Sequence, residues 1–598
     1  MRYLLGRLWH HLGPRRRRHF VILFALMLLS AIAEVISLGA VLPFIGILAV
    51  PEKVLDQPVI AALAERFGIE TAAELVLPLA LAFALAAIGA AAIRILVTWL
   101  STRLTFVAGA DISIEVYRRA LYQPYRFHVE RNSSELISGI TGKVGHTTLG
   151  VLLPILTLLS AGVVLVAIVT TLVIIDPVMA LIAAVGFGSS YGLITWISRR
   201  RLQRNSERIA EEHGKVVKAL QEGLGGIRDV LLHGTQQVYC DVYRQSDLRW
   251  RLAQGENVFI SQSPRFAMEA LGMVLIAALA FGLSRQPGGL VEALPVLGVL
   301  ALGAQRLLPA MQQVFRSWAT IAGSYASFAD TVELLDQPLA AEALRPPPAA
   351  LSFSDSICLD GVGFGYHDPD SLVLDDINLT IRRGQRIGFV GSTGSGKSTL
   401  MDLLMGLLAP SKGRITVDGK ELNAATMRAW QQALAHVPQS IFLADASLAE
   451  NIALGVRRAD IDLERVRRAA RQAQIADTIE SWQHGYDTVV GERGVRLSGG
   501  QRQRIGIARA LYRQASVLVL DEATSALDNE TERSVMDAIR GLDRGLTILI
   551  IAHRLTTVRS CDLIVELDGG RIAAQGQYDE LIENSEGFRR MALTAGTR

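Results

Sequence analysis

Long apolar segments fill the first half of the chain, and short apolar runs separated by polar residues fill the second half. Six of the long segments are near the length that a helix needs to cross a bilayer, roughly 20 residues. Their approximate limits are Phe20–Val50, Leu75–Leu100, Leu149–Ile175, Val178–Ile197, Val258–Leu283 and Leu294–Trp318. The pattern predicts an all-α membrane domain with six helices, the first of which is long enough to tilt or to break near Pro43.

The segments between these spans predict their orientation. Arg and Lys are concentrated in Met1–Arg18 and in the long connections Ser101–Gly145 and Ser198–Asn257. Positively charged connections tend to stay in the cytoplasm, so we expect both termini to be cytoplasmic. Helical periodicity continues through Arg103–Tyr122 and Arg199–Leu224, and we therefore expect spans two to five to project well beyond the bilayer.

Composition indicates two environments in one chain. A chain of 598 residues is too long for a single core, and half of its residues are hydrophobic. Charge is concentrated in Met1–Arg18, in Arg199–Arg251 and after Leu351, so the apolar excess belongs to the membrane half. The net charge of +3 is small and the basic clusters flank apolar spans, so the sequence gives no support to nucleic-acid binding.

Three smaller features of the sequence are a basic run before the first span, an amphipathic segment after it and three isolated cysteines. Arg15–Arg18 resembles the charged start of a signal peptide, but the apolar segment after it is far too long, and we interpret it as a retained first span. The amphipathic segment Pro51–Glu74 is expected outside the membrane. Cys240, Cys358 and Cys561 lack metal-ligand spacing, which suits a reducing compartment, and we expect all three to be buried as small hydrophobic side chains.

The second half of the chain predicts a soluble α/β domain. Pro346–Pro348 breaks the helical pattern, so we place the membrane domain at residues 1–340, a linker at 341–350 and the soluble domain at 351–598. Short β-type runs alternate with helical stretches, a pattern typical of a mainly parallel sheet. These runs are Ile387–Val390, Ala435–Pro438, Val517–Leu520 and Thr547–Ile551.

A glycine-rich octapeptide follows the first of these runs and fits the phosphate-binding loop of P-loop ATPases. Glycine and serine turns also occur in ordinary surface loops, but here a strand precedes the loop and the helical run Thr399–Leu408 follows it. We expect Lys397 to reach the β- and γ-phosphates and the Ser398 hydroxyl to ligate Mg²⁺. The predicted phosphate site consists of Gly391, Ser392, Thr393, Gly394, Ser395, Gly396, Lys397, Ser398 and Thr399.

Polar residues at the ends of three other strands supply the chemistry that such a loop needs. Asp521 and Glu522 end an apolar strand, and we expect Asp521 to hold the Mg²⁺ shell and Glu522 to polarise the attacking water as general base. Gln439 follows another strand and is a candidate for sensing both Mg²⁺ and water. A lone histidine is more often structural, but the position of His553 after a third strand favours a contact with the γ-phosphate.

A second anion-binding helix start lies at Leu497–Gln501, before the helical run Arg502–Leu511. With this motif the sequence resembles the ATP-binding cassette (ABC) transporter superfamily over its whole length. The matching residues, in the family's order, are Gly391 to Ser398, Gln439, Leu497, Ser498, Gly499, Gly500, Gln501, Asp521, Glu522, Ser525, Ala526, Leu527, Asp528 and His553.

The resemblance implies several further features. Tyr366 sits where the family stacks an aromatic ring on adenine. In the family, the segment that corresponds to Leu497–Gln501, called the signature segment, closes on the nucleotide bound by a second ATPase domain, or cassette. This implies a homodimer that uses ATP and Mg²⁺. Six spans followed by one cassette are similar to bacterial half-size exporters, which implies a place in the cytoplasmic membrane. Coupling helices are expected near Tyr122–Val129 and Gly223–Val230, and Gly491–Gly494 looks like the segment that exporters place against them.

Three arginines inside the predicted spans are candidates for substrate binding. A charge there costs several kcal/mol unless it faces water or a partner. Arg265 has Glu269 four residues later, so an ion pair within the helix competes with the ligand hypothesis. Arg94 and Arg306 have no acidic residue within four positions, and for them we favour ligand binding over pairing with Glu34 or a backbone carbonyl.

A narrower resemblance concerns the substrate. Short matches around Ile36–Ile45, Pro264–Gly272 and Arg306–Ala310 look like the flippase that moves lipid-linked oligosaccharides for bacterial protein N-glycosylation. The resemblance implies that Arg94, Arg265 and Arg306 face the pyrophosphate of a polyprenyl-linked sugar. A multidrug or other lipid exporter and a cassette that regulates a partner are the alternatives. A drug exporter favours an aromatic, weakly charged cavity, and a regulator tolerates decay of the catalytic residues, which are intact here.

Overall fold

A computed structural model gives the fold. It describes residues 1–49, 72–175, 177–284, 289–339, 345–346, 348–366, 371–522, 529–541, 545–552 and 555–596. The chain divides into two compact units. One unit comprises Met1–Gln123 and His128–Leu339, and the other comprises Pro124–Phe127 and Ala340–Arg598.

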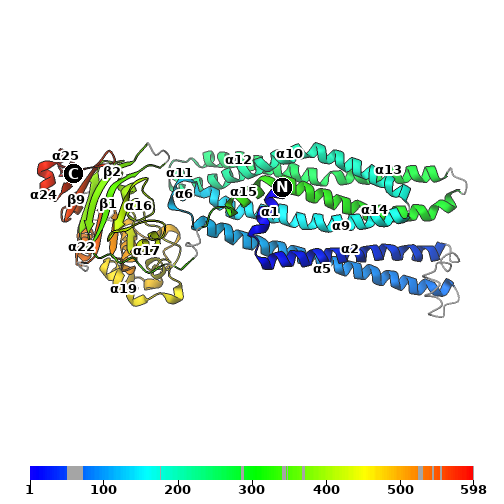
Figure 1. The fold of residues 1–598 in the computed structure, drawn as a ribbon, viewed down its shortest axis with the longest axis horizontal. Coiled ribbons are helices and arrows are strands. Elements are labelled where there is room, and N and C mark those ends of the chain that lie inside the picture. Colours follow the sequence, from blue (N-terminus) through cyan, green and yellow to red (C-terminus); the bar gives the residue numbers. More distant parts are fainter. Residues whose placement is uncertain are drawn as a thin grey trace. The chain divides into compact units, whose positions relative to one another are not determined.

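The first unit is entirely helical. Its main helices are α1 Arg2–His11, α2 Pro14–Ala49, α5 Ala72–Leu121, α9 Leu153–Ile175, α10 Pro177–Gly225, α12 Gln236–Gln262, α13 Pro264–Ser284, α14 Gly289–Gly323 and α15 Tyr325–Leu335. Shorter ones are α7 Ser133–Ser138, η1 Gly139–Lys143, α8 Val144–Thr147, η2 Thr148–Leu152 and α11 Ile227–Leu232. The short helix α6 Tyr125–Glu130 is divided, because Pro124–Phe127 belongs to the second unit. Helix α2 packs along α5, α9 along α14 and α10 along α12 (Figure 1).

These helices confirm the expected helical membrane domain. Helices α5 and α10 continue far past their apolar segments, as the periodicity predicts, and α2 runs through Pro43 without a break. The fifth predicted span is divided between α12 and α13 at Ser263, because Pro264 has no backbone N–H to continue the hydrogen bonding of α12. Ser263 itself keeps helical backbone angles. Pro51–Glu74 lies largely outside the described residues.

Three stretches of the part that the structure describes are long and apolar enough to cross a membrane, namely Pro14–Ser37, Glu74–Leu121 and Ser133–Thr171. The other three predicted spans lie in α10, α12 to α13 and α14, where many side chains fall outside the description. Cys561 is buried as expected and Cys358 is half-buried. The expectation for Cys240 is wrong, because its position on α12 leaves it exposed.

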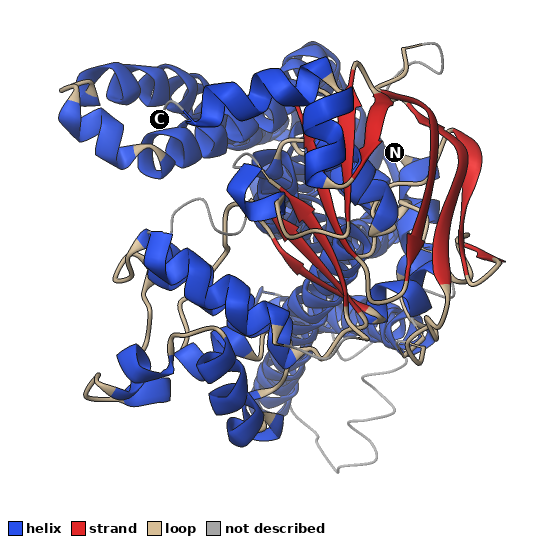
Figure 2. Cartoon of the chain, turned by 90° about the vertical axis from the view of Figure 1, so that its left-hand side faces the viewer, coloured by secondary structure: helices blue, strands red, loops and turns tan. Residues whose placement is uncertain are grey.

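The second unit contains two sheets, drawn red in Figure 2. One has the order β10-β9-β3-β8-β7-β6, in which β9, β3, β8, β7 and β6 run parallel. The other, antiparallel, has the order β2-β1-β4-β5. The strands are β1 Ser356–Phe364, β2 Leu374–Arg382, β3 Arg386–Gly391, β4 Lys412–Val417, β5 Lys420–Glu421, β6 Leu434–Val437, β7 Val517–Asp521, β8 Thr547–Ile551, β9 Leu563–Asp568 and β10 Arg571–Gly576.

Helices flank these strands. They are α16 Lys397–Leu404, α17 Met427–Gln432, α18 Leu448–Ile452, η4 Arg458–Asp460, α19 Leu463–Gln472, α20 Ala476–Glu480, η5 Gly485–Asp487, η6 Glu492–Gly494, α21 Gly499–Tyr512, α22 Asn529–Arg540, α23 Leu555–Val558, α24 Tyr578–Asn584 and α25 Glu586–Gly596.

The parallel sheet is buried on both faces. Along β7, Val517 and Val519 enter one hydrophobic core while Leu518 and Leu520 enter another, and β8 alternates in the same way. Strands covered on both sides read as unbroken apolar runs, which is why the sequence reveals them. Their carboxyl ends share one edge of the sheet, and the predicted catalytic residues follow those ends.

Candidate nucleotide site

The phosphate loop joins β3 to α16. Its glycines adopt backbone angles that other residues avoid, with φ of 147° at Gly391, 84° at Gly394 and 98° at Gly396. A Cβ atom on Gly391 would lie 2.1 Å from the carbonyl oxygen of Leu567, so a side chain there is excluded. The loop therefore brings its backbone to the start of α16, the arrangement that binds phosphate.

Lys397 lies folded against this loop. Its Nζ donates hydrogen bonds to the carbonyl oxygens of Gly391 at 2.9 Å and Ser392 at 2.8 Å, and to Ser395 Oγ at 3.4 Å. Burial lowers the pKa of Lys397, while the carboxylates of Glu522 and Asp521 act in the opposite sense. An ammonium that is largely desolvated and held by carbonyl oxygens gains by exchanging them for phosphate oxygens. The loop therefore fits a nucleotide phosphate.

The remaining loop residues are divided between the interior and the surface. Ser395 and Thr399 are buried, which fixes the loop on the sheet. Ser392, Thr393 and Ser398 are exposed, and Ser398 stands in the first turn of α16. The Ser398 hydroxyl is thus accessible to a ligand, as the predicted role in holding Mg²⁺ requires.

Glu522 contacts Gln439 across the edge of the sheet. The Gln439 Nε2 donates a hydrogen bond of 2.7 Å to Glu522 Oε2, and Asp521 ends β7 next to it. Glu522 has φ of 47°, a strained value for a residue with a side chain. Such strain is typical of functional sites, where surrounding contacts hold the residue in place. Three of the predicted residues are thus brought together.

Two residues that the sequence analysis missed support this edge. Gln503 on α21 is buried, and its Nε2 donates a 3.4 Å hydrogen bond to the carbonyl oxygen of Glu522. Asp402 on α16 has its pKa raised to about 6, chiefly by burial and then by Asp521. No local pattern marks either residue, because both act through tertiary contacts.

Asp402 makes the stability of the nucleotide-free protein depend on pH. Its folded-state pKa of about 6 exceeds the ordinary value of 3.8, so the folded form binds the proton more tightly. Stability is therefore lost as pH rises through this window. We expect Asp402→Asn to unfold at a higher temperature than wild type at pH 7.5 and at a similar temperature at pH 4.5. Melting temperatures are measured by fluorescence. If wild type and Asp402→Asn differ by the same amount at pH 7.5 and at pH 4.5, the raised pKa of Asp402 is contradicted.

The signature segment builds a second helix start. Ser498 caps α21, with its Oγ accepting a hydrogen bond from the Gln501 backbone N–H at 3.2 Å and its own N–H donating to Gln501 Oε1 at 2.9 Å. Ser498 is exposed, and Gly499, Gly500 and Gln501 are partly exposed. The first backbone N–H groups of this 14-residue helix are therefore available to an anion.

Other predicted residues stand at the margin of the site. The Tyr366 hydroxyl lies 3.4 Å from Thr399 Oγ1, and its ring packs edge-on against Phe364. Asp528 and His553 lie outside the described residues, as does Ser525–Asp528 as a whole. The adenine contact of Tyr366, nucleotide binding by Asp528 and the γ-phosphate contact of His553 stay predictions.

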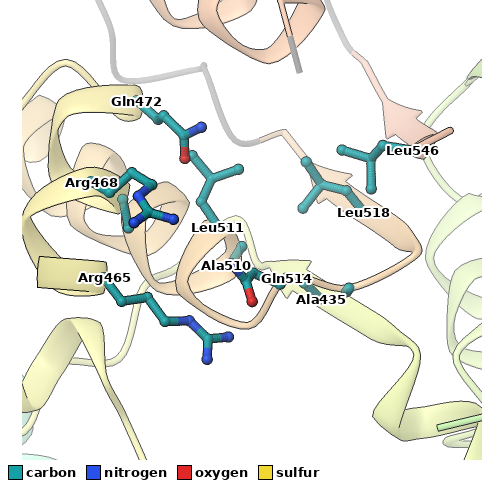
Figure 3. Close-up of a pocket in the computed structure, with 11 residues that line it drawn as sticks. Ala435, Arg465, Arg468, Gln472, Ala510, Leu511, Gln514, Leu518 and Leu546 are labelled. Atoms are coloured by element: carbon teal, nitrogen blue, oxygen red, sulfur yellow. The ribbon is translucent and has the colours of Figure 1, made fainter. Parts of the chain in front are cut away.

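A separate cavity of about 410 Å³ lies between α19, α21 and the sheet (Figure 3). Arg465 and Arg468 line it together with the apolar side chains of Leu511, Leu518 and Leu546. Arg465 lies over the Tyr512 ring, 4.5 Å from its centroid. The described lining includes none of the predicted nucleotide residues, so this cavity is distinct from the phosphate loop.

In the helical unit, two of the three candidate arginines have carboxylate partners. Arg94 forms an ion pair with Glu34, whose side chain is 5% exposed while that of Arg94 is 58% exposed. The pairing that we ranked below ligand binding is therefore present. Arg265 pairs with Glu269 at 2.7 Å, as its spacing allows. Arg306 lies on α14, and its side chain is outside the description.

Comparisons with known proteins agree with this architecture. The ABC transporter transmembrane region matches residues 20–285 and the ABC transporter model matches residues 374–525. An ATP-dependent lipid A-core flippase of Chromohalobacter salexigens is 33% identical over 78% of this chain and 80% of the relative. A beta-(1→2)glucan export ATP-binding/permease protein of Rhizobium meliloti is 31% identical over 84% and 85%.

A solved structure of a bacterial Atm1-family ABC exporter with ATP bound aligns with a TM-score of 0.77 at 26% identity, covering 97% of this chain and 98% of that one. The helical unit and the P-loop unit therefore define a multi-pass membrane protein that binds nucleotide. The chain belongs to the ABC transporter family, as a half-transporter of the exporter type that couples ATP hydrolysis to transport.

Proposed function

We propose that this exporter flips a lipid-linked oligosaccharide, carried on a polyprenyl pyrophosphate, across the bacterial cytoplasmic membrane. It works as a homodimer, with both termini and the ATPase domain in the cytoplasm. Relatives named as lipid A-core flippases and as a glucan exporter support a substrate that contains a lipid, a glycan or both. The chemistry of the helix arginines supports the pyrophosphate.

The exposed guanidinium of Arg94 carries this proposal. Glu34 is buried and neutralises the charge, yet more than half of the Arg94 side chain stays exposed on an apolar helix. The hydrogen bond from Arg94 to Glu34 uses Nη2, which leaves the other N–H donors of the guanidinium for a ligand. Arg265 is arranged similarly, because it contacts Glu269 through Nε and remains 54% exposed.

Arginine suits a phosphate ligand in this setting. It stays protonated in a low-dielectric environment and offers paired donors that match phosphate oxygens. A carboxylate partner lowers the cost of keeping the cation among apolar helices before substrate arrives. On this view Glu34 and Glu269 hold the arginines in place, and the pyrophosphate binds the N–H groups that the glutamates do not use.

The cassette residues would supply the driving reaction. Ser398 and Asp521 would hold Mg²⁺, with Gln439 completing the set, and the ion would neutralise phosphate charge. Lys397 would leave the carbonyl oxygens of its loop for the β- and γ-phosphates. Glu522, already oriented by Gln439, would accept a proton from the attacking water, and His553 would hold the γ-phosphate.

A second copy of the chain would complete each nucleotide site. The half-transporter has one phosphate loop and one signature segment, and the exposed Ser498 at the start of α21 presents anion-binding N–H groups. The resemblance to the family places that segment on the nucleotide of the partner cassette. The dimer would therefore contain two composite sites and twelve spans.

The substrate hypothesis predicts separate effects on flipping and on ATP hydrolysis. We expect Arg94→Ala and Arg306→Ala to reduce ATP-driven flipping of a labelled polyprenyl-pyrophosphate glycan in liposomes by at least about tenfold, the loss of one charge-assisted phosphate contact. Basal ATPase activity in detergent should stay within about twofold, because the cassette is chemically unchanged. Normal flipping by both variants overturns the pyrophosphate site.

Charge controls separate ligand binding from folding. Arg94→Ala removes the ion pair that Arg94 makes with the buried Glu34, so it is compared with the double variant Arg94→Ala and Glu34→Gln. Arg265→Ala is compared in the same way with the double variant Arg265→Ala and Glu269→Ala. Folding restored without flipping supports the ligand role. Flipping restored shows that the arginine only neutralised its neighbour. The exposed Arg199 on α10, changed to Ala, controls for loss of positive charge.

A further inference from the structure

A second amphipathic cavity, of about 470 Å³, lies between α2 and α5. Its lining combines three basic side chains with six apolar ones. The residues are Arg16, His19, Ile22, Leu23 and Leu26 from α2, and Leu100, Arg103, Leu104 and Val107 from α5. The volume falls within the range of small-molecule sites, roughly 300 to 1,000 Å³.

The lining residues form one stripe on each helix. On α5 they recur at spacings of three and four, from Leu100 to Val107, and on α2 the same spacing runs from Arg16 to Leu26. The two helices pack along each other, and Leu23 belongs to a small hydrophobic cluster that α2 and α5 form with Leu156 of α9. The cavity therefore lies between two packed helix faces, and no loop residue is among its described lining.

This cavity is separate from the proposed substrate arginine on the same helix. Arg103 follows Arg94 by nine residues, which at about 100° per residue places it on the opposite face of α5, some 13 Å further along. Arg94 pairs with Glu34, and neither residue is among those that line the cavity. A ligand here would not compete directly for Arg94.

The ionisable groups that line the cavity are all basic. Arg16 is neutralised by Asp111 at 2.6 Å, whereas Arg103 contacts the Trp99 ring at 5.2 Å from its centroid. Among the described lining residues there is no carboxylate, and His19 adds an imidazole ring. The cavity thus places the Arg103 cation, which has no carboxylate partner among the described contacts, beside an apolar surface. These features fit an amphipathic anion as ligand.

We propose that this cavity binds an anionic phospholipid of the surrounding bilayer, with the phosphate at Arg103, His19 and Arg16 and the acyl chains along the leucines. The basic run Arg15–Arg18 includes the lining residue Arg16 and attracts anionic lipid headgroups to the same end of α2. A soluble anion would leave the six apolar side chains unused. The proposal does not depend on which substrate the exporter moves.

The test measures which lipids stay bound to the purified full-length protein. Wild type, Arg103→Gln and Arg200→Gln are exchanged into detergent micelles that contain equal amounts of phosphatidylglycerol and phosphatidylcholine, and bound lipid is counted by native mass spectrometry. Arg200 is an exposed arginine on α10 and serves as the matched control. We expect wild type and control to retain phosphatidylglycerol preferentially. Arg103→Gln should bind it about fivefold more weakly, equivalent to roughly 1 kcal/mol.

A second variant tests the cavity itself. Leu104→Trp fills the space without changing charge, and it should displace phosphatidylglycerol while ATPase activity and dimer size remain normal. Equal retention of both lipids, or an Arg103→Gln variant that matches the control, overturns the proposal. Displacement of the lipid by inorganic phosphate would identify a soluble anion instead. Dissociation of the dimer by Leu104→Trp would identify an interface between copies, which also overturns the lipid site.

Discussion

The Glu522→Gln variant is expected to hydrolyse ATP at least about 100-fold more slowly than wild type while it still binds nucleotide. Glutamine keeps the shape of glutamate but cannot accept a proton from water. The hydrogen bond that Gln439 Nε2 donates to Oε2 at 2.7 Å can be kept by the amide oxygen of the new side chain. Glu522 has φ of 47°, and we expect the variant to keep this backbone angle because the two side chains have the same shape.

Steady-state ATPase assays and equilibrium ATP binding on the purified protein measure the two effects separately. Glu421→Gln is a suitable control, because Glu421 is an exposed carboxylate on β5 of the same unit. We expect the control to hydrolyse ATP at the wild-type rate and Glu522→Gln to accumulate in the nucleotide-bound form. Near-normal turnover by Glu522→Gln would show that another group activates the water.

The parts of the fold that could be predicted depend on local pattern. The parallel strands around Ile387 and Val517 are unbroken apolar runs because both faces of their sheet are buried. The antiparallel sheet escaped prediction, since β1 and β2 mix buried and exposed positions with bulges in their register. The break at Ser263 also depended on a single proline rather than on periodicity.

In the candidate sites, too, some contacts follow from local sequence pattern and others do not. Gln439 and Glu522 were each placed at a strand end, and parallel strands bring those ends to one edge, where the two side chains meet. Pairing across the helices is different. Glu34 and Arg94 lie 60 residues apart, so no spacing rule selects one for the other, whereas Arg265 and Glu269 share a helix face.

A mixed dimer provides the sharpest test that two copies share each nucleotide site. Lys397→Ala removes a cation from the phosphate loop, and Ser498→Arg blocks the exposed start of α21. Each variant alone should lose ATPase activity by about 100-fold or more, because both composite sites are damaged in a uniform dimer. Combining one chain of each kind concentrates both defects in one site.

If the signature segment acts on the partner's nucleotide, the other site of the mixed dimer contains an unaltered phosphate loop and an unaltered Ser498. Dimers purified through two different affinity tags should then trap one nucleotide each with vanadate, whereas uniform dimers of either variant trap none. A tagged wild-type dimer that traps two sets the scale. If the mixed dimer also traps none while it remains assembled, the segment acts within its own chain, and the proposed pairing of phosphate loop and α21 between copies is wrong.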